Sequence, residues 1–204
     1  MIRFFVVFLC WCCVFPSWGN DCLKYKNIPR VILNVPKWKK NVVQPSVPMG
    51  GHYGKVEATL IENFEIITDI NQVDDGYCVA LKTVNAEIGY DNFEVQIDAK
   101  NKPNSCEYNA VMEHENTHIK TYLGVVDDFK VDLQRSVFNA ADSIMPVWVQ
   151  SFDDIDMIIN KMHDNLVKHP DLILVKQKLH AAEEIKNKKV DEQETGESLK
   201  KCNL

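Results

Sequence analysis

The sequence predicts an α+β fold, in which a small antiparallel sheet is followed by helices. Between residues 55 and 98 apolar and polar residues alternate, most regularly over residues 93–98, which is typical of half-buried strands. From Ser105 onward the apolar residues recur with the helical period of about 3.6 residues. The 204 residues, 46% of them hydrophobic and 25% charged, suit one globular domain.

The first nineteen residues have the features of an export signal. Arg3 supplies a positive start, residues 4–15 form an almost unbroken apolar run, and Ser17 and Gly19 are small residues at a cleavage-site spacing. The apolar run is shorter than the roughly 20 residues that span a bilayer. We therefore predict a signal peptide over residues 1–19, cut near Gly19, and no stable membrane association afterwards. The alternative is a retained N-terminal anchor.

Cleavage would leave four of the seven cysteines, namely Cys22, Cys78, Cys106 and Cys202. An even number in an exported chain predicts two disulfides, for which three connectivities exist. We favour Cys78 with Cys106, which would tie a strand to the start of the following helix. Cys22 with Cys202 would then join the two ends of the mature chain.

The charge of the chain excludes two classes of partner. Removal of Arg3 reduces the 23 basic residues to 22, against 29 acidic residues. An acidic chain without a basic stripe argues against binding to nucleic acid and to anionic membrane surfaces. The short basic and aromatic segment at residues 37–40 is expected to be a solvated strand edge.

The predicted sheet has three to five strands. Prolines at 36, 45 and 48 break the apolar runs 31–35 and 42–43 into short edge strands or extended coil. Residues 74–76 and 89–92 contain the Asp, Asn and Gly residues of turns, so each is expected to separate two strands. Residues 55–65 also fit a helix.

A long helix is predicted after the sheet. Asn104 can cap its N-terminus, and Glu107 completes a capping box. The helical pattern continues to about Ala141, which would give a helix of about 55 Å. A compact domain of this size is only about 40 Å across, so we expect a bend or break near Gly124.

Two shorter helices and a tail are predicted to follow. The second helix covers about residues 153–168, and the third runs from Asp171 to near Lys186. Residues 188–204 are polar and lack periodicity, which predicts a C-terminal tail. The folded domain is therefore expected to span residues 20–187.

The long helix contains the sequence His114-Glu115-Asn-Thr-His118, the pattern HExxH. Its spacing places the two imidazoles one helical turn apart. At about 100° per residue, His118 and Glu115 lie within about 100° of His114, in the same arc as Val111 and Val125. Polar groups on a core-facing stripe cost several kcal/mol unless they are satisfied, and a metal ion would satisfy them. The alternative is a pair of hydrogen-bonded core histidines beside a buried carboxylate.

The metal interpretation predicts hydrolysis of peptide bonds. His114 and His118 would bind Zn²⁺ through neutral imidazole nitrogens, leaving a coordination position for water. Glu115 would act as general base on the zinc-activated water that attacks the carbonyl. Three tyrosines could assist the developing oxyanion: Tyr90, Tyr108 and Tyr122.

Residues 111–119 resemble the extended signature of zincin metallopeptidases, in which the residues between and just after the histidines are uncharged. Asn116, Thr117 and Ile119 match this pattern, while Lys120 stands where a hydrophobic residue is usual. The wider arrangement resembles small bacterial exported proteins regarded as Zn-dependent proteases. This resemblance implies a zincin-like fold, metal ligands at positions 114 and 118, and the catalytic base at position 115.

The sequence does not identify a third zinc ligand. The metzincin extension would need a glycine at position 121 and a histidine at position 124, where this chain has Thr121 and Gly124. The gluzincin pattern needs a glutamate on a following helix, and no glutamate occurs between Glu115 and Glu183. Six residues remain as candidates: Asp127, Asp128, His169, Asp171, His180 and Glu183.

Three functions are compatible with these features. The leading hypothesis is an exported zinc metalloprotease, a periplasmic or secreted hydrolase acting on peptides or proteins. The alternative is a non-catalytic metal-binding or peptide-binding module of the cell envelope that retains the zincin fold. The third is an envelope scaffold protein with a chance motif. No feature of the sequence predicts an oligomeric state.

Overall fold

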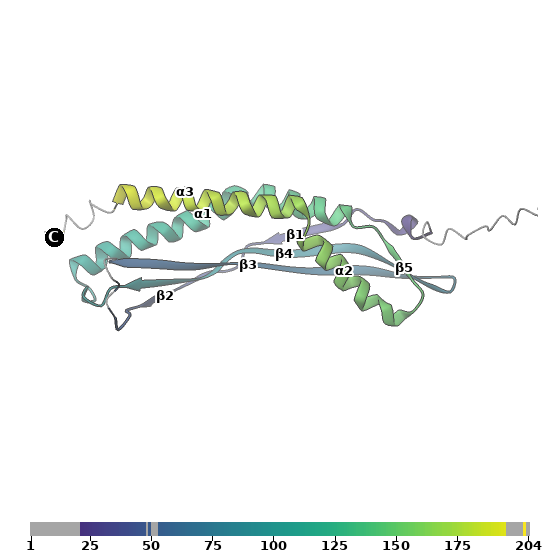
Figure 1. Ribbon diagram of the computed structural model, residues 1–204, viewed down its shortest axis with the longest axis horizontal. Helices are drawn as coiled ribbons and strands as arrows, with labels where there is room; N and C mark the ends of the chain where they lie inside the picture. Colours follow the sequence, from purple (N-terminus) through teal and green to yellow (C-terminus); the bar gives the residue numbers. More distant parts are fainter. Residues whose placement is uncertain (1–20, 48, 50–52, 195–201, 203–204) are drawn as a thin grey trace, which may run out of the picture.

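The computed structural model describes residues 21–47, 49, 53–194 and 202. The predicted signal peptide, with its cleavage near Gly19, lies outside the described residues. The protein is elongated, and a layer of helices runs along one face of a long sheet (Figure 1). The prediction of a mixed helix and strand fold is confirmed, and four of the five strands precede the long helices, while one short strand, Val147–Val149, follows the first of them.

A long antiparallel hairpin forms the centre of the sheet. Strand β3 (Gly54–Val73) turns at Asp74, whose φ is 42°, into strand β4 (Gly76–Ile97), as the turn signal at residues 74–76 predicts. Residues 55–65 are therefore strand and not helix. The second predicted turn, at residues 89–92, is wrong, because these residues continue β4. The pairing of β4 with β3 is irregular between Tyr90 and Phe93, and the neighbouring Gly89, which pairs with Ile61, has a φ of 152° that favours glycine.

Three short strands lie along the other edge of β4. Strands β1 (Arg30–Asn34) and β2 (Lys39–Val43) pair parallel with it, and β5 (Val147–Val149) pairs antiparallel. The sheet is thus mixed, and the prediction of an antiparallel sheet is wrong for two strands. The reason is that β4 inserts between β2 and β3, which follow one another in the chain. Two successive reversals of direction make β4 parallel to β2.

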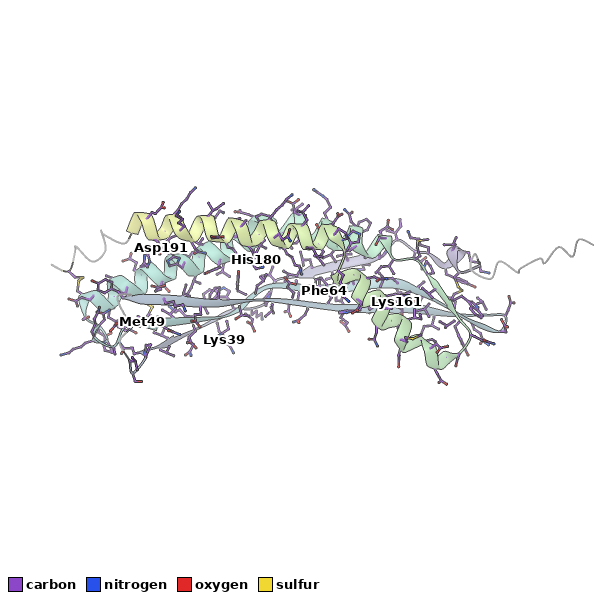
Figure 2. All side chains as sticks on the ribbon, viewed as in Figure 1. Lys39, Met49, Phe64, Lys161, His180 and Asp191 are labelled. Carbon is purple, nitrogen blue, oxygen red and sulfur yellow. A yellow bond between two sulfur atoms is a disulfide. The ribbon has the colours of Figure 1, made fainter. Side chains whose placement is uncertain are left out.

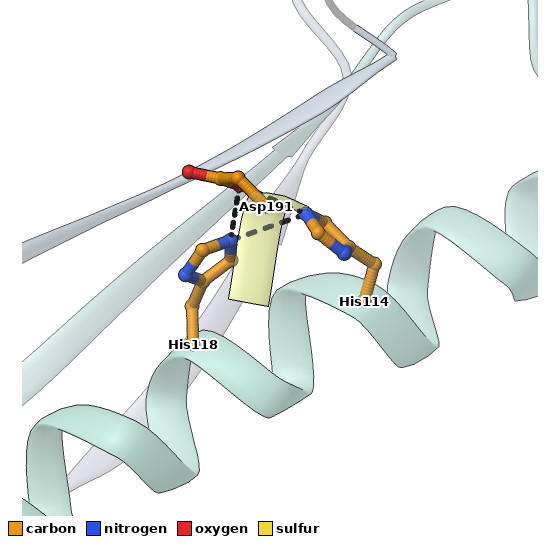
Figure 3. Close-up of side chains that lie close together, drawn as sticks. All are labelled: His114, His118 and Asp191. Carbon is orange, nitrogen blue, oxygen red and sulfur yellow. Dashed lines mark hydrogen bonds and ion pairs between the residues drawn. The ribbon is translucent and has the colours of Figure 1, made fainter. Parts of the chain in front are cut away.

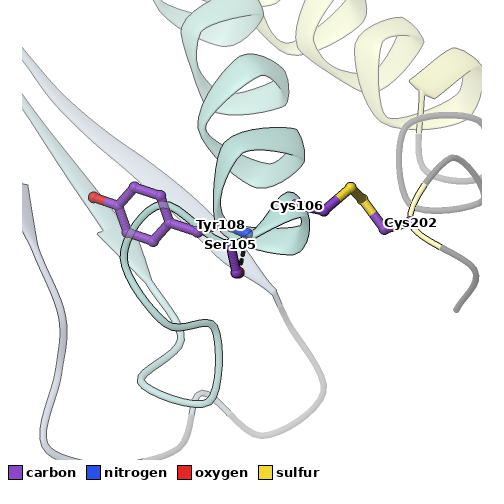
Figure 4. The surroundings of a disulfide bond; sticks show 4 residues. All are labelled: Ser105, Cys106, Tyr108 and Cys202. Atoms are coloured by element: carbon purple, nitrogen blue, oxygen red, sulfur yellow. Dashed lines mark hydrogen bonds between the residues drawn. A yellow bond between two sulfur atoms is a disulfide. The ribbon is translucent and has the colours of Figure 1, made fainter.

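Helix α1 (Cys106–Ser143) is one continuous helix of 38 residues. It is about 57 Å long at 1.5 Å per residue, and the break predicted near Gly124 is wrong. Strands of 20 and 22 residues are themselves about 65–75 Å long, so the helix has a sheet of matching length beneath it. The N-cap is Ser105 and not Asn104, since the Ser105 hydroxyl oxygen accepts from the Tyr108 N–H at 3.1 Å (Figure 4).

The connection from β4 to α1 is held by a buried carboxylate. Asp98 is 2% exposed and accepts hydrogen bonds from the backbone N–H groups of Lys100 and Met49, at 2.9 and 3.0 Å. These two bonds lower the pKa of Asp98 below its ordinary value, because they stabilise the charged form.

Two further helices follow β5 and the short 3-10 helix η2 (Phe152–Asp154). Helix α2 (Ile155–Val167) confirms the predicted second helix and packs against β3 and β4. Helix α3 (Pro170–Glu194) lies beside α1 (Figure 1). It extends past the predicted end near Lys186, so residues 188–194 are helical where a tail was predicted. Packing along α1 stabilises this polar end, where Val190 is buried.

Two disulfides are present, as predicted, but their connectivity differs from the prediction. Cys22, in the 3-10 helix η1 (Asp21–Tyr25), bonds to Cys78, and Cys106 bonds to Cys202 (Figure 4). Cys78 lies near the start of β4 and Cys106 follows the far end of that strand, so about 60 Å of strand separates them. A disulfide requires Cα atoms within about 7 Å. The two bonds fit an oxidising compartment.

Among the described residues, none of the helices combines the length and the apolar character that crossing a membrane requires.

Candidate metal centre

Helix α1 presents two imidazoles on the side that faces α3. His114 and His118 are separated by one turn, and their Nε2 atoms lie 3.1 Å apart (Figure 3). The side chains are 19% and 10% exposed. The predicted phase of the helix is confirmed, because Val111, Glu115 and His118 are all buried on the inner side.

The third member of the group is Asp191, near the C-terminal end of α3 (Figures 2 and 3). Its Oδ1 atom lies 3.0 Å from His118 Nε2 and 3.4 Å from His114 Nε2. Helix α3 runs antiparallel to α1, which brings a residue 73 positions further along the chain back to the level of His118. The Asp191 side chain is 59% exposed, so the group opens to solvent on this side.

The three donor atoms lie close enough together to hold one metal ion. Zinc binds imidazole nitrogen and carboxylate oxygen at about 2.0–2.2 Å, so tetrahedral geometry places neighbouring ligand atoms about 3.3–3.5 Å apart. The observed separations between the three donors are 3.0, 3.1 and 3.4 Å. The two nitrogens and the oxygen therefore fit zinc with little adjustment of the side chains.

Glu115, the predicted base, lies on the sheet side of α1. It is 3% exposed, and its carboxylate sits over the start of β3, where a Cβ atom on Gly54 would fall 2.7 Å from Oε1. Only glycine permits so close an approach of strand and helix. Burial raises the pKa of Glu115 to about 7, an effect partly opposed by His118 and reinforced by Asp191. A cation bound to the histidines would lower this pKa.

A second buried polar contact lies further along the same interface. The Tyr90 hydroxyl, on β4, donates a hydrogen bond to Glu183, whose other oxygen lies 3.1 Å from His180 Nδ1. Both Tyr90 and Glu183 are buried, and burial raises the pKa of Tyr90, which keeps its hydroxyl a donor. Tyr122 packs edge-on against the Tyr90 ring at 5.1 Å. Of the three tyrosines that could assist an oxyanion, Tyr90 thus already donates its hydroxyl proton to Glu183.

None of the six predicted third ligands belongs to the metal group that the described residues form. Most have other partners in the structure. Asp128 pairs with Lys186 at 2.6 Å, Asp171 accepts from Asn139 at 2.9 Å, and Glu183 is bound by Tyr90. The remaining three candidates lie outside the group as well: Asp127, His169 and His180.

Sequence analysis missed Asp191 because the third helix was ended too early. A helix stopped near Lys186 leaves position 191 in a tail, where no fixed geometry can be argued. The pattern Glu183, Asn187 and Asp191 was a usable signal, since polar residues four positions apart form one face of a helix. That face of α3 packs against the side of α1 that carries His118.

Comparison of the chain with protein-family models, with curated proteins and with solved structures found no match. The resemblance to zincins consequently rests on the motif, and the chemistry is inferred from the geometry of the group.

Proposed function

We propose that the chain is an exported zinc-dependent metallopeptidase, with His114, His118 and Asp191 as zinc ligands and Glu115 as general base. The observation that carries the proposal is the convergence of the three donor atoms within 3.4 Å of one another. Two imidazoles with one carboxylate are donors that suit zinc, and the group adds a third ligand to the HExxH motif.

The number of donors favours a catalytic site over a structural one. The group that the described residues form has three members, whereas structural zinc sites are closed by four protein ligands. Catalytic sites keep one position open, and the exposure of Asp191 gives solvent a route to the group. The two disulfides support action in the periplasm or outside the cell, where such bonds persist.

Each residue has a separate role in the proposed reaction. His114 and His118 hold the ion with neutral nitrogens, and Asp191 adds a negative charge that offsets part of its charge. When bound, zinc supplies Lewis acidity, which polarises a carbonyl and acidifies water. Glu115 takes a proton from the attacking water and returns it to the leaving amine.

One observation favours a second function. Glu115 is buried against Gly54, so its carboxylate contacts the sheet as well as flanking the histidines. A glutamate used only to pack the helix onto β3 would fit a metal-binding module without turnover.

The experiment that separates the two functions compares the wild type with Glu115→Gln on a broad, unfolded protein substrate. The matched control is Glu113→Gln, an acidic residue on the exposed side of the same helix. A metallopeptidase binds about one zinc per chain, cleaves the substrate, and loses cleavage in Glu115→Gln but not in Glu113→Gln. Zinc binding without cleavage by the wild type contradicts the proposal and supports the binding module. Absence of bound zinc contradicts both.

A further inference from the structure

His118 is held through both of its ring nitrogens by the same helix. Its Nε2 atom faces Asp191 at 3.0 Å, and its Nδ1 atom faces the side-chain oxygen of Asn187 at 2.8 Å. Asn187 and Asp191 are one helical turn apart on α3, so both point at α1 from one face. The imidazole lies between them, with its ring plane fixed at two points.

The orientation of the Asn187 amide determines which nitrogen of His118 carries the proton. An amide oxygen can only accept a hydrogen bond, so with the Asn187 amide in this orientation Nδ1 carries a proton. In a neutral ring Nε2 then has the lone pair, so this nitrogen and Asp191 Oδ1 are both acceptors 3.0 Å apart, and a metal ion between them would satisfy both. This is the tautomer that a metal ion in the group requires.

The other half of the Asn187 amide also bears on this assignment. Its Nδ2 atom is buried and has no hydrogen-bond partner among the described residues. An unpaired buried donor is unfavourable, and turning the amide over would give Nδ2 a partner at His118 Nδ1. That arrangement would need the opposite tautomer, with the proton on Nε2 and no lone pair for a metal. The amide orientation and the occupancy of the metal site are therefore coupled.

We propose that Asn187 is a positioning residue for the metal centre, which holds His118 in the tautomer that presents Nε2 to the ion. This inference rests on the proposed function, because it concerns the same zinc site. Asn187 fixes the ring without placing a second negative charge beside Asp191. It acts through His118 and is not itself a ligand.

The test measures zinc affinity at neutral pH, by competition with a chromogenic chelator, in the wild type and three variants. Asn187→Leu removes the acceptor, and we expect it to weaken zinc binding about 10–100-fold. Asn187→Asp keeps an acceptor oxygen in place, and we expect affinity equal to or tighter than that of the wild type. Gln177→Leu makes the same amide-to-leucine change at an exposed position of α3 and should leave affinity unchanged.

Nitrogen NMR of isotopically labelled, zinc-loaded wild type gives a readout that does not depend on any variant folding. We expect His118 with a protonated Nδ1 and a metal-bound Nε2. A protonated Nε2, or equal zinc affinity in Asn187→Leu and the wild type, overturns the inference while leaving the proposed function intact. A wild type that binds no zinc overturns both. A loss in Asn187→Leu that Asn187→Asp restores supports the inference.

Discussion

The disulfide between Cys106 and Cys202 links the chain beyond α3 to the start of α1, the helix that carries His114 and His118. Its removal tests whether this bond keeps Asp191 in position. Asp191 lies less than one turn from the last described helical residue, Glu194. Helix ends fray at little cost in free energy, so the last turn of α3 needs an anchor. We predict that replacing both cysteines by serine loosens this end and weakens zinc binding.

The expected magnitudes follow from the positions of the bonded cysteines. Cys106 and Cys202 are 96 residues apart, and Cys22 and Cys78 are 56 apart. The chain-entropy model gives about 4–5 kcal/mol of stability for either bond. Loss of either bond should therefore lower the free energy of unfolding by similar amounts. Zinc affinity should fall only when the Cys106–Cys202 bond is removed. If the loosened helix end leaves about one half to one tenth of the chains competent to bind zinc, the affinity falls about twofold to tenfold.

The assay combines urea unfolding, with chelator present, and zinc competition on chains that unfold cooperatively. The serine double variant of Cys22 and Cys78 is the matched control, because its bond lies at the β5 end of the sheet. Equal loss of zinc affinity in both double variants, or no loss in the Cys106 and Cys202 variant, would refute the anchoring role.

Three smaller predictions concern stability. In Gly54→Ala the new Cβ would lie 2.7 Å from Glu115 Oε1, so urea unfolding should show a free energy of unfolding lower by about 1–3 kcal/mol. In Gly124→Ala the new Cβ would have nothing within 4 Å, so the free energy of unfolding should rise by up to about 1 kcal/mol from helix propensity. Tyr90→Phe deprives one carboxylate oxygen of buried Glu183 of its donor and should cost about 1–3 kcal/mol by the same assay, so an unchanged midpoint contradicts this role. The pKa of Asp98 is lowered in the folded chain, so its stabilising contribution is present above about pH 4, the ordinary pKa, and is lost as pH falls through the folded value. The stability difference between the wild type and Asp98→Asn should accordingly shrink in acid, and a difference independent of pH contradicts this assignment.

Local patterns predicted the features that depend on a few neighbouring residues. The helical phase of His114, Glu115 and His118 follows from the period of 3.6 residues, and these side chains do lie on the inner side of α1. The turn at residues 74–76 follows from its Asp and Gly residues. Such signals need no knowledge of the rest of the chain, since backbone sterics and one buried face determine them.

Two of the errors, the break near Gly124 and the pairing of Cys78 with Cys106, share one physical cause. Residues 89–92 carry turn residues, and treating them as a turn divides β4 into two short strands. A short sheet implies a compact domain, in which α1 must break near Gly124 and Cys78 lies close to Cys106. The structure instead accommodates residues 91–92 as an irregularity within a 22-residue strand. Strand pairing across the sheet, which the local pattern does not encode, decides between the two outcomes.

Asp191 was missed through the same assumption of short elements. Packing against α1 extends α3 to Glu194 although its last turns have few apolar residues. The register between the two helices then places Asp191 beside His118. Neither the extension nor the register can be derived from helical periodicity alone, because both depend on the partner helix.

The most direct test of the metal centre is the zinc content of purified, disulfide-bonded protein in three forms. These are the wild type, Asp191→Ala and Glu192→Ala. Glu192→Ala is the matched control, because Glu192 is an exposed acidic residue next to Asp191 on α3. The arrangement of His114, His118 and Asp191 predicts about one zinc per chain in the wild type and Glu192→Ala, and a large loss in Asp191→Ala. Equal zinc content in all three forms would contradict a ligand role for Asp191, and a wild type without zinc would contradict the metal centre itself.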